Sequence, residues 1–181
     1  MRLALYCTAL LGLLVSPVLA GTIDVYLVPA SQSVNISAGT ATVNIVADIP
    51  QSDPLIGWGL DLTLIGTSVT YGGASIDPNG PFSAAYTPDG DGLAGLTTIP
   101  PGRPYGEIYG DGIVLATVTL NLVQLGVTQL VPGFPDPLGA FHGLMTPTGF
   151  ATAAFTSGQI EVTPEPAALA LLGLGLLLRR R

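Results

Sequence analysis

Short runs in which every second residue is apolar cover most of the sequence between Gly21 and Thr163. TIDVYLV, from Thr22, and GWGLDLTLI, from Gly57, both show this period of two. The 24 glycines and 16 prolines of the chain interrupt the runs at short intervals. Such alternation, with many β-branched residues, predicts strands that bury one face. The residues expected to face the core are Ile23, Val25 and Leu27; Val43, Ile45, Ala47 and Ile49; Trp58, Leu60, Leu62 and Leu64; Val114, Ala116, Val118, Leu120 and Leu122; and Ile160 and Val162.

Residues 21–163 show no helical period with capping residues, so the sequence predicts a single all-β domain, an antiparallel β-sandwich. About 143 residues suffice for one core that buries roughly two-thirds of the unfolded surface. Two connections, Gly72–Tyr109 and Pro132–Gly149, are long for a compact domain. We expect them to carry function in part and to contain short edge strands.

The first 20 residues have the three parts of a secretory signal peptide: a positive charge at Arg2, an apolar run over Leu3–Val15 and a small-residue ending at Ala20. Cleavage is expected after Ala20, which would leave Gly21 as the first residue. The apolar run has about 13 residues, whereas a membrane span needs about 20. The one cysteine, Cys7, lies in this segment, so the mature protein is expected to have neither a disulfide nor a thiolate metal site.

The chain has no lysine, and four of its five arginines belong to the two ends of the sequence. Between Gly21 and Thr163, eleven acidic residues stand against Arg103 alone, a net charge of −10. A surface of this charge repels phosphate backbones and anionic lipid, so nucleic acid is not an expected partner.

The C-terminal segment ends in twelve apolar residues, Ala167–Leu178, followed by Arg179, Arg180 and Arg181. As a helix the apolar stretch would be about 18 Å long, against about 30 Å for a bilayer core. The arginines would stay on the cytoplasmic side of an inserted helix.

Residues 164–181 contain three parts in order: Pro164, Glu165 and Pro166, then the apolar helix, then the arginine cluster. This arrangement resembles the PEP-CTERM sorting signal of Gram-negative bacteria that make extracellular polysaccharide. Tails of this kind are also described as an ice-binding protein C-terminal domain, a label that concerns the tail alone. The resemblance implies transient insertion in the inner membrane and recognition by an exosortase. Export to the cell envelope, outer surface or matrix follows, and whether the tail is cleaved or retained stays open.

Four motifs follow one another in residues 22–163: GTATVNIVADIP comes early, a long strand containing Trp58 follows, then GDGIVLATVTLNLV and finally GQIEV. This order resembles a cohesin-type jelly-roll sandwich. The resemblance implies docking to a dockerin-like protein or an adhesive role, and it transfers no contact residues.

A calcium ion is the one metal that the sequence suggests. Asp89 and Asp91 lie two residues apart in the turn PDGDG, and Asp111 could join them from a strand end. Carboxylate oxygens on a flexible turn suit a hard cation, although an ordinary β-turn explains the same residues. No other cofactor is expected.

Aromatic residues in the first long connection could bind sugar. Tyr86, Tyr105 and Tyr109 could form a stacking platform for a polysaccharide, or could close the open end of the sandwich. Trp58 is expected in the core.

No catalytic residue is predicted. The only histidine, His142, lies in a Gly/Pro-rich stretch, and most of the acidic residues lie in Asp-Gly or Asp-Pro turns. We therefore expect an exported non-enzymatic surface or matrix protein that binds protein or polysaccharide. The alternative is a secreted carbohydrate-active hydrolase with paired carboxylates.

Overall fold

The computed structural model describes residues 21–77, 81–86, 92–97, 106–134 and 143–166, with only the backbone at 83–86 and 92–97. These residues form strands apart from one 3-10 turn, Ile36–Ala38, so the all-β prediction is confirmed. The two terminal helices expected from the sequence lie outside the described residues. Within the described part of the chain, no helix is long and apolar enough to cross a membrane.

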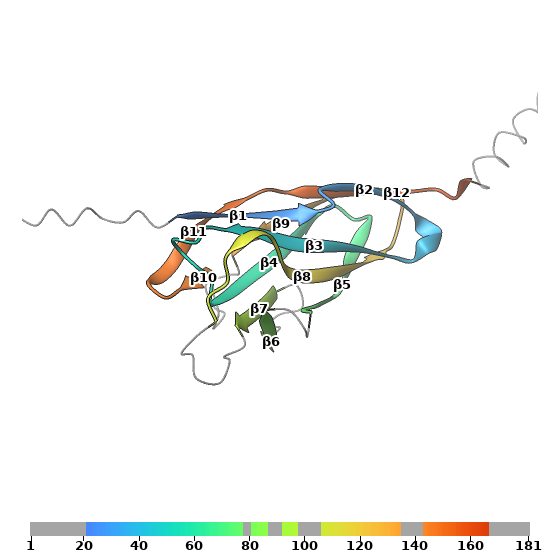
Figure 1. Cartoon of the computed structure of the whole chain (residues 1–181). Helices are drawn as coiled ribbons and strands as arrows, with labels where there is room; N and C mark the ends of the chain where they lie inside the picture. The colour runs from blue at the N-terminus through green and yellow to red at the C-terminus, as the bar shows by residue number, and fades with distance from the viewer. Residues whose placement is uncertain (1–20, 78–80, 87–91, 98–105, 135–142, 167–181) are drawn as a thin grey trace, which may run out of the picture.

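Two packed sheets make up the sandwich (Figure 1). The first sheet contains, in order, β11 (Gly149–Phe155), β1 (Thr22–Val28), β3 (Thr40–Ile49), β8 (Gly110–Leu122) and β5 (Val69–Ser75). The second contains β2 (Ser31–Asn35), β12 (Gly158–Thr163), β9 (Gly126–Gly133), β4 (Gly57–Ile65) and β10 (Gly143–Thr146), with β7 (Gly92–Thr97) on β4 and β6 (Phe82–Tyr86) on β7. The sheets join through β11, whose first residues pair with β10 and whose last pair with β1.

Two strand pairs are parallel, so the prediction of a purely antiparallel sandwich is wrong. β1 runs parallel to β11, with Thr22 opposite Thr152, and β2 runs parallel to β12, with Gln159 opposite Ser31. Both parallel pairs arise because the chain changes sheet between β1 and β2. In each sheet the N-terminal strand lies beside a C-terminal strand that runs in the same direction, β1 beside β11 and β2 beside β12. The fold is therefore a mixed sandwich.

The core lies between the sheets and includes most of the residues that alternation predicted for β1, β3, β4 and β12; Leu64 of β4, also predicted, is only partly buried. Ile23, Val25, Val43, Leu60 and Ile160 are each no more than 1% exposed. Trp58 is also buried, as expected, and its ring meets Phe82 edge-on with a centroid distance of 6.1 Å.

The inward face of β8 changes at a β-bulge. Ile45 pairs with Ala116 and the next residue, Val46, pairs with Val114, so Leu115 is the extra residue on β8. Leu115 is 1% exposed, whereas Val114, predicted to face the core, is 44% exposed. The bulge shifts the alternation by one residue, and Ala116, Val118 and Leu120 remain buried as predicted.

Both long connections contain short strands, as expected. The first includes β6 and β7, with β6 at the edge of its sheet, and the second includes β10. Figure 1 shows β6 and β7 on the side of the molecule opposite to the paired β2 and β12.

Candidate interaction surface

The outer face of the first sheet carries a continuous set of uncharged polar side chains, which we call the Thr/Asn face. Its cross-strand pairs are Thr42 with Thr119, Asn44 with Thr117, and Asn121 with Thr70. Alternation explains the face, because the residues between these positions point into the core. All six side chains are exposed or half-buried.

Hydrogen bonding and close packing hold parts of this face in place. Thr117 donates its hydroxyl to Oδ1 of Asn44 at 2.8 Å, which joins β8 to β3 through their side chains. Gly72 of β5 lies under Asn121: a Cβ on this glycine would be 2.9 Å from the Asn121 Oδ1. The close approach needs a residue without a side chain at position 72 of β5.

A row of apolar side chains borders the Thr/Asn face. Tyr26 of β1 is opposite Val46 of β3, which is opposite Val114 of β8. Val46 is only 4% exposed although it points outward, while Val114 remains largely exposed. The bulge at Leu115 is what brings Val114 to the outer surface.

Beyond this row the surface is acidic. Asp48 of β3 accepts hydrogen bonds at one oxygen, Oδ1, from the Tyr26 hydroxyl at 3.0 Å and from the Gly112 amide at 2.7 Å. Gly112 has a φ of 68°, a left-handed conformation that favours glycine. Asp24 is directly opposite Asp48 on β1.

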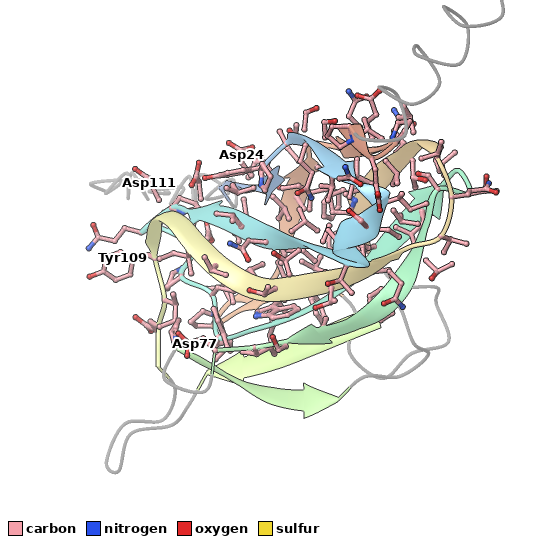
Figure 2. All side chains as sticks on the ribbon, turned by 90° about the vertical axis from the view of Figure 1, so that its right-hand side faces the viewer. Asp24, Asp77, Tyr109 and Asp111 are labelled. Carbon is pink, nitrogen blue, oxygen red and sulfur yellow. The ribbon has the colours of Figure 1, made fainter. Side chains whose placement is uncertain are left out.

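Asp48 also determines the ionisation of Tyr26. The hydrogen bond to Asp48 is the main cause that raises the pKa of Tyr26 above its ordinary value; burial and the negative charges of Asp48 and Asp111 add to it. The Tyr26 hydroxyl therefore remains a donor throughout the physiological range. Figure 2 shows Asp24, Asp111 and Tyr109 on the same side of the molecule.

Negative charge extends over the whole described part of the chain. The residues that the structure describes include Asp and Glu but no lysine, arginine or histidine. The acidic end of the first sheet is thus not neutralised by any basic side chain of the described residues. A partner with basic residues would be attracted to it.

The residues predicted for calcium are only partly described. Asp111 is exposed at the start of β8, while Asp89 and Asp91 lie outside the described residues. Among those that are described, no group of three His, Cys, Asp or Glu side chains is arranged to hold a metal ion. The calcium site stays a prediction.

The predicted tyrosine platform is likewise incomplete. Tyr109 is 50% exposed beside β8, which suits a contact residue. Only the backbone of Tyr86 is described, in β6, and Tyr105 lies outside the described residues, as does His142. The tyrosine platform therefore stays a prediction.

The two processing sites lie at opposite ends of the described chain. The sorting motif, Pro164, Glu165 and Pro166, follows β12 directly. The Pro164 carbonyl accepts a hydrogen bond from Nδ2 of the Asn35 side chain at 3.3 Å, and Glu165 and Pro166 are exposed. Arg179, Arg180 and Arg181 lie outside the described residues, as does Ala20. Gly21 is described, and its amide donates to a carboxylate oxygen of Asp53.

Asp53 is a residue whose environment the sequence did not reveal. It precedes a proline, and an acid in that context is expected to cap its own backbone in a turn. In the structure its side chain is 4% exposed.

Comparison with known proteins identifies the fold. No protein-family model matches the sequence, and no curated protein is similar to it at a significant level. The structure resembles the cohesin of a type I cohesin–dockerin complex from Clostridium thermocellum, with 15% identity and a TM-score of 0.55 over 81% of this chain and 97% of that one.

Two further cohesins are similar. The third ScaB cohesin of R. flavefaciens, in complex with a group 1 dockerin, has 13% identity and a TM-score of 0.55 over 81% of this chain and 99% of that one. A non-cellulosomal cohesin from the archaeon Archaeoglobus fulgidus has 13% identity and a TM-score of 0.53 over 83% and 97%. These likenesses confirm a cohesin-like β-sandwich, the fold that the motif order suggested.

Proposed function

We propose that this protein is a non-enzymatic binding module that docks a protein partner on the Thr/Asn face of its first sheet. The observation that supports this most is the composition of that face, six uncharged polar side chains with Gly72 packed against Asn121. Short hydroxyl and amide side chains lose little conformational entropy when they are covered. Several of the structurally similar cohesins were solved in complex with dockerins, which favours a dockerin-like partner.

The surroundings of the Thr/Asn face indicate the chemistry of that partner. An apolar side chain could cover the exposed Val114, and basic side chains could approach Asp24, Asp48 and Asp111 at the acidic end. The charge would mainly accelerate association, while the central polar contacts would give specificity. Binding should therefore weaken as salt concentration rises.

Delivery is the second part of the proposal. The signal peptide would direct export, and an exosortase would recognise Pro164, Glu165 and Pro166 of the PEP-CTERM-like tail. Exposed residues directly after β12 suit recognition by an enzyme. The protein would then act at the envelope, outer surface or matrix of a Gram-negative bacterium.

Polysaccharide binding is a second candidate, which the exposed ring of Tyr109 favours. Calcium bound through Asp111, with Asp89 and Asp91, would be a further property of the same region.

The test is binding by matched surface variants. The exported protein is immobilised and exposed to the secreted proteins of its host, and any partner that binds is identified by mass spectrometry and purified. The affinity of this partner is then measured by calorimetry for wild type, Thr42→Arg and Thr63→Arg. Thr42 lies on the Thr/Asn face, and Thr63 is an exposed threonine on β4 of the other sheet. We expect at least a tenfold loss of affinity for Thr42→Arg, about 1.4 kcal/mol, and less than a twofold change for Thr63→Arg.

Other outcomes would contradict the proposal. Equal losses for the two variants would place the contact elsewhere. Binding to matrix polysaccharide that Tyr109→Ala abolishes would favour the second candidate, and hydrolysis of that polysaccharide would establish the hydrolase instead.

A further inference from the structure

A buried carboxylate lies next to the residue at which the mature chain is expected to begin. Asp53 is 4% exposed and ends the turn in which its amide donates to the Pro50 carbonyl at 3.1 Å. Its Oδ2 accepts a hydrogen bond from the Ser52 hydroxyl at 3.2 Å and another from the amide nitrogen of Gly21. The first nitrogen after the predicted cleavage site therefore points at a buried negative charge.

The surroundings of Gly21 leave room for glycine only. A Cβ at this position would lie 2.8 Å from Cγ of Pro50, 3.0 Å from Oδ2 of Asp53 and 3.3 Å from Oγ of Ser52. The first contact is shorter than real Cβ contacts, and the proline ring has little freedom to move away. The turn 50–53 is thus shaped around a residue without a side chain whose nitrogen faces the carboxylate.

Asp53 has no basic side chain to neutralise it within the described residues, which contain no lysine, arginine or histidine. The charged groups near the start of β1 are acidic too, since Asp24 on β1 is opposite Asp48 on β3. A buried carboxylate without a counter-charge is costly, and the hydrogen bonds from one peptide amide and one hydroxyl compensate it only in part. A positive charge on the Gly21 nitrogen would offset both the buried charge and the acidic surroundings.

We propose that Asp53 and Ser52 form a binding site for the α-ammonium group of the processed chain. Hydrolysis of the Ala20–Gly21 peptide bond consumes one water, leaves a carboxylate on Ala20 and an amine on Gly21, and the amine takes up a proton from solvent. The amide hydrogen bond to Asp53 becomes an ion pair, which fixes the start of β1. The inference rests on the cleavage included in the proposed function, and it does not depend on any partner.

The absence of lysine gives a direct assay, because the α-amino group is the only primary amine of the processed chain. The chain that begins at Gly21 is treated with an amine-acylating reagent at pH 8, and the labelled fraction is followed by intact mass. We expect labelling at least tenfold slower than in Asp53→Asn, since an amine held as an ammonium ion in a covered site is a poor nucleophile. Asp24→Asn, which removes an exposed acid from β1, should label like wild type.

A second measurement keeps the test informative if Asp53→Asn does not fold. Wild type in urea should label at least tenfold faster than folded wild type, at the rate of a short peptide with the same N-terminal sequence. Equal rates in the folded and unfolded chain, or in wild type and a folded Asp53→Asn, would overturn the inference.

Stability provides an independent readout. Adding Ala20 before Gly21 should raise the unfolding equilibrium constant at least tenfold in wild type and less than twofold in Asp53→Asn. The mass of the protein from its host tests the premise separately: a start at Gly21 supports the inference, and any other start overturns it while leaving the partner-binding proposal intact.

Discussion

The hydroxyl of Thr128 joins β9 to the turn between β4 and β5, and Thr128→Val should therefore be strongly destabilising. Thr128 of β9 is fully buried, and its Oγ1 accepts a hydrogen bond from the Ser68 amide at 3.1 Å. It also shares a 2.6 Å hydrogen bond with the hydroxyl of Ser68, which is 2% exposed. The Ser68 carbonyl accepts in turn from the amide of Val123 at 2.9 Å.

The magnitude follows from the groups that lose their partner. Valine has nearly the shape of threonine, so the substitution creates little cavity but removes the acceptor of a buried amide and the partner of a buried hydroxyl. Each such loss costs about 1–3 kcal/mol, so Thr128→Val should lower the free energy of unfolding by about 2–6 kcal/mol. Adding Ser68→Ala removes the orphaned hydroxyl and should restore about 1 kcal/mol, leaving only the amide unsatisfied.

Urea unfolding, followed by Trp58 fluorescence, measures these differences. With a slope of about 2 kcal/mol per molar urea, the midpoint of Thr128→Val should fall by roughly 1–3 M. Thr63→Val, the same substitution at an exposed site, should change stability by less than about 0.5 kcal/mol. A midpoint for Thr128→Val equal to that of wild type, or a double variant less stable than Thr128→Val alone, would refute the reasoning.

Two further predictions concern the bulge and the tyrosine. Leu115→Ala should cost about 2–5 kcal/mol of unfolding free energy in the same urea assay, and Val114→Ala less than about 1 kcal/mol; the reverse order would mean that Val114 faces the core after all. In a spectrophotometric titration, with Tyr26→Phe to identify the signal, Asp48→Asn should lower the pKa of Tyr26. Because that pKa is raised in the folded state, the hydrogen bond stabilises fully below the ordinary tyrosine pKa, near 10, and its contribution is lost as pH rises through the folded value. An unchanged titration would mean that Asp48 does not hold the proton in place.

Alternation predicted most of the buried faces of β1, β3, β4 and β12 because an apolar residue stands at every second position there. In β8 it failed within a run of four apolar residues, Ile113–Ala116. Such a run fits either register, and only pairing with Ile45 and Val46 decides which residue is extra. The sequence did not predict the parallel pairs either, because the sequence of a strand does not show in which direction its neighbour runs.

The candidate surface was predictable in pieces. The outward positions of Thr117, Thr119 and Asn121 followed from the sequence, but their cross-strand neighbours on β3 and β5 depend on non-local register. Asp53 is a sharper case: its Asp-Pro context predicted a turn, but not that the residue is buried and in contact with Gly21, 32 residues away. Local patterns identify such residues as polar without showing what covers them.

The parallel pairing of the chain's two ends has a consequence for the order of folding. Thr22 meets Thr152, and Ser31 meets Gln159, so β1 and β2 find these neighbours only when the last two strands have been made. A chain that emerges N-terminus first, from a ribosome or through a membrane channel, therefore carries an incomplete core until residues 149–163 are free. Pairing over such sequence separations is slow. Until then the domain would stay unfolded enough to pass through a channel. Its core would be complete only once β12, which directly precedes Pro164, is available for pairing.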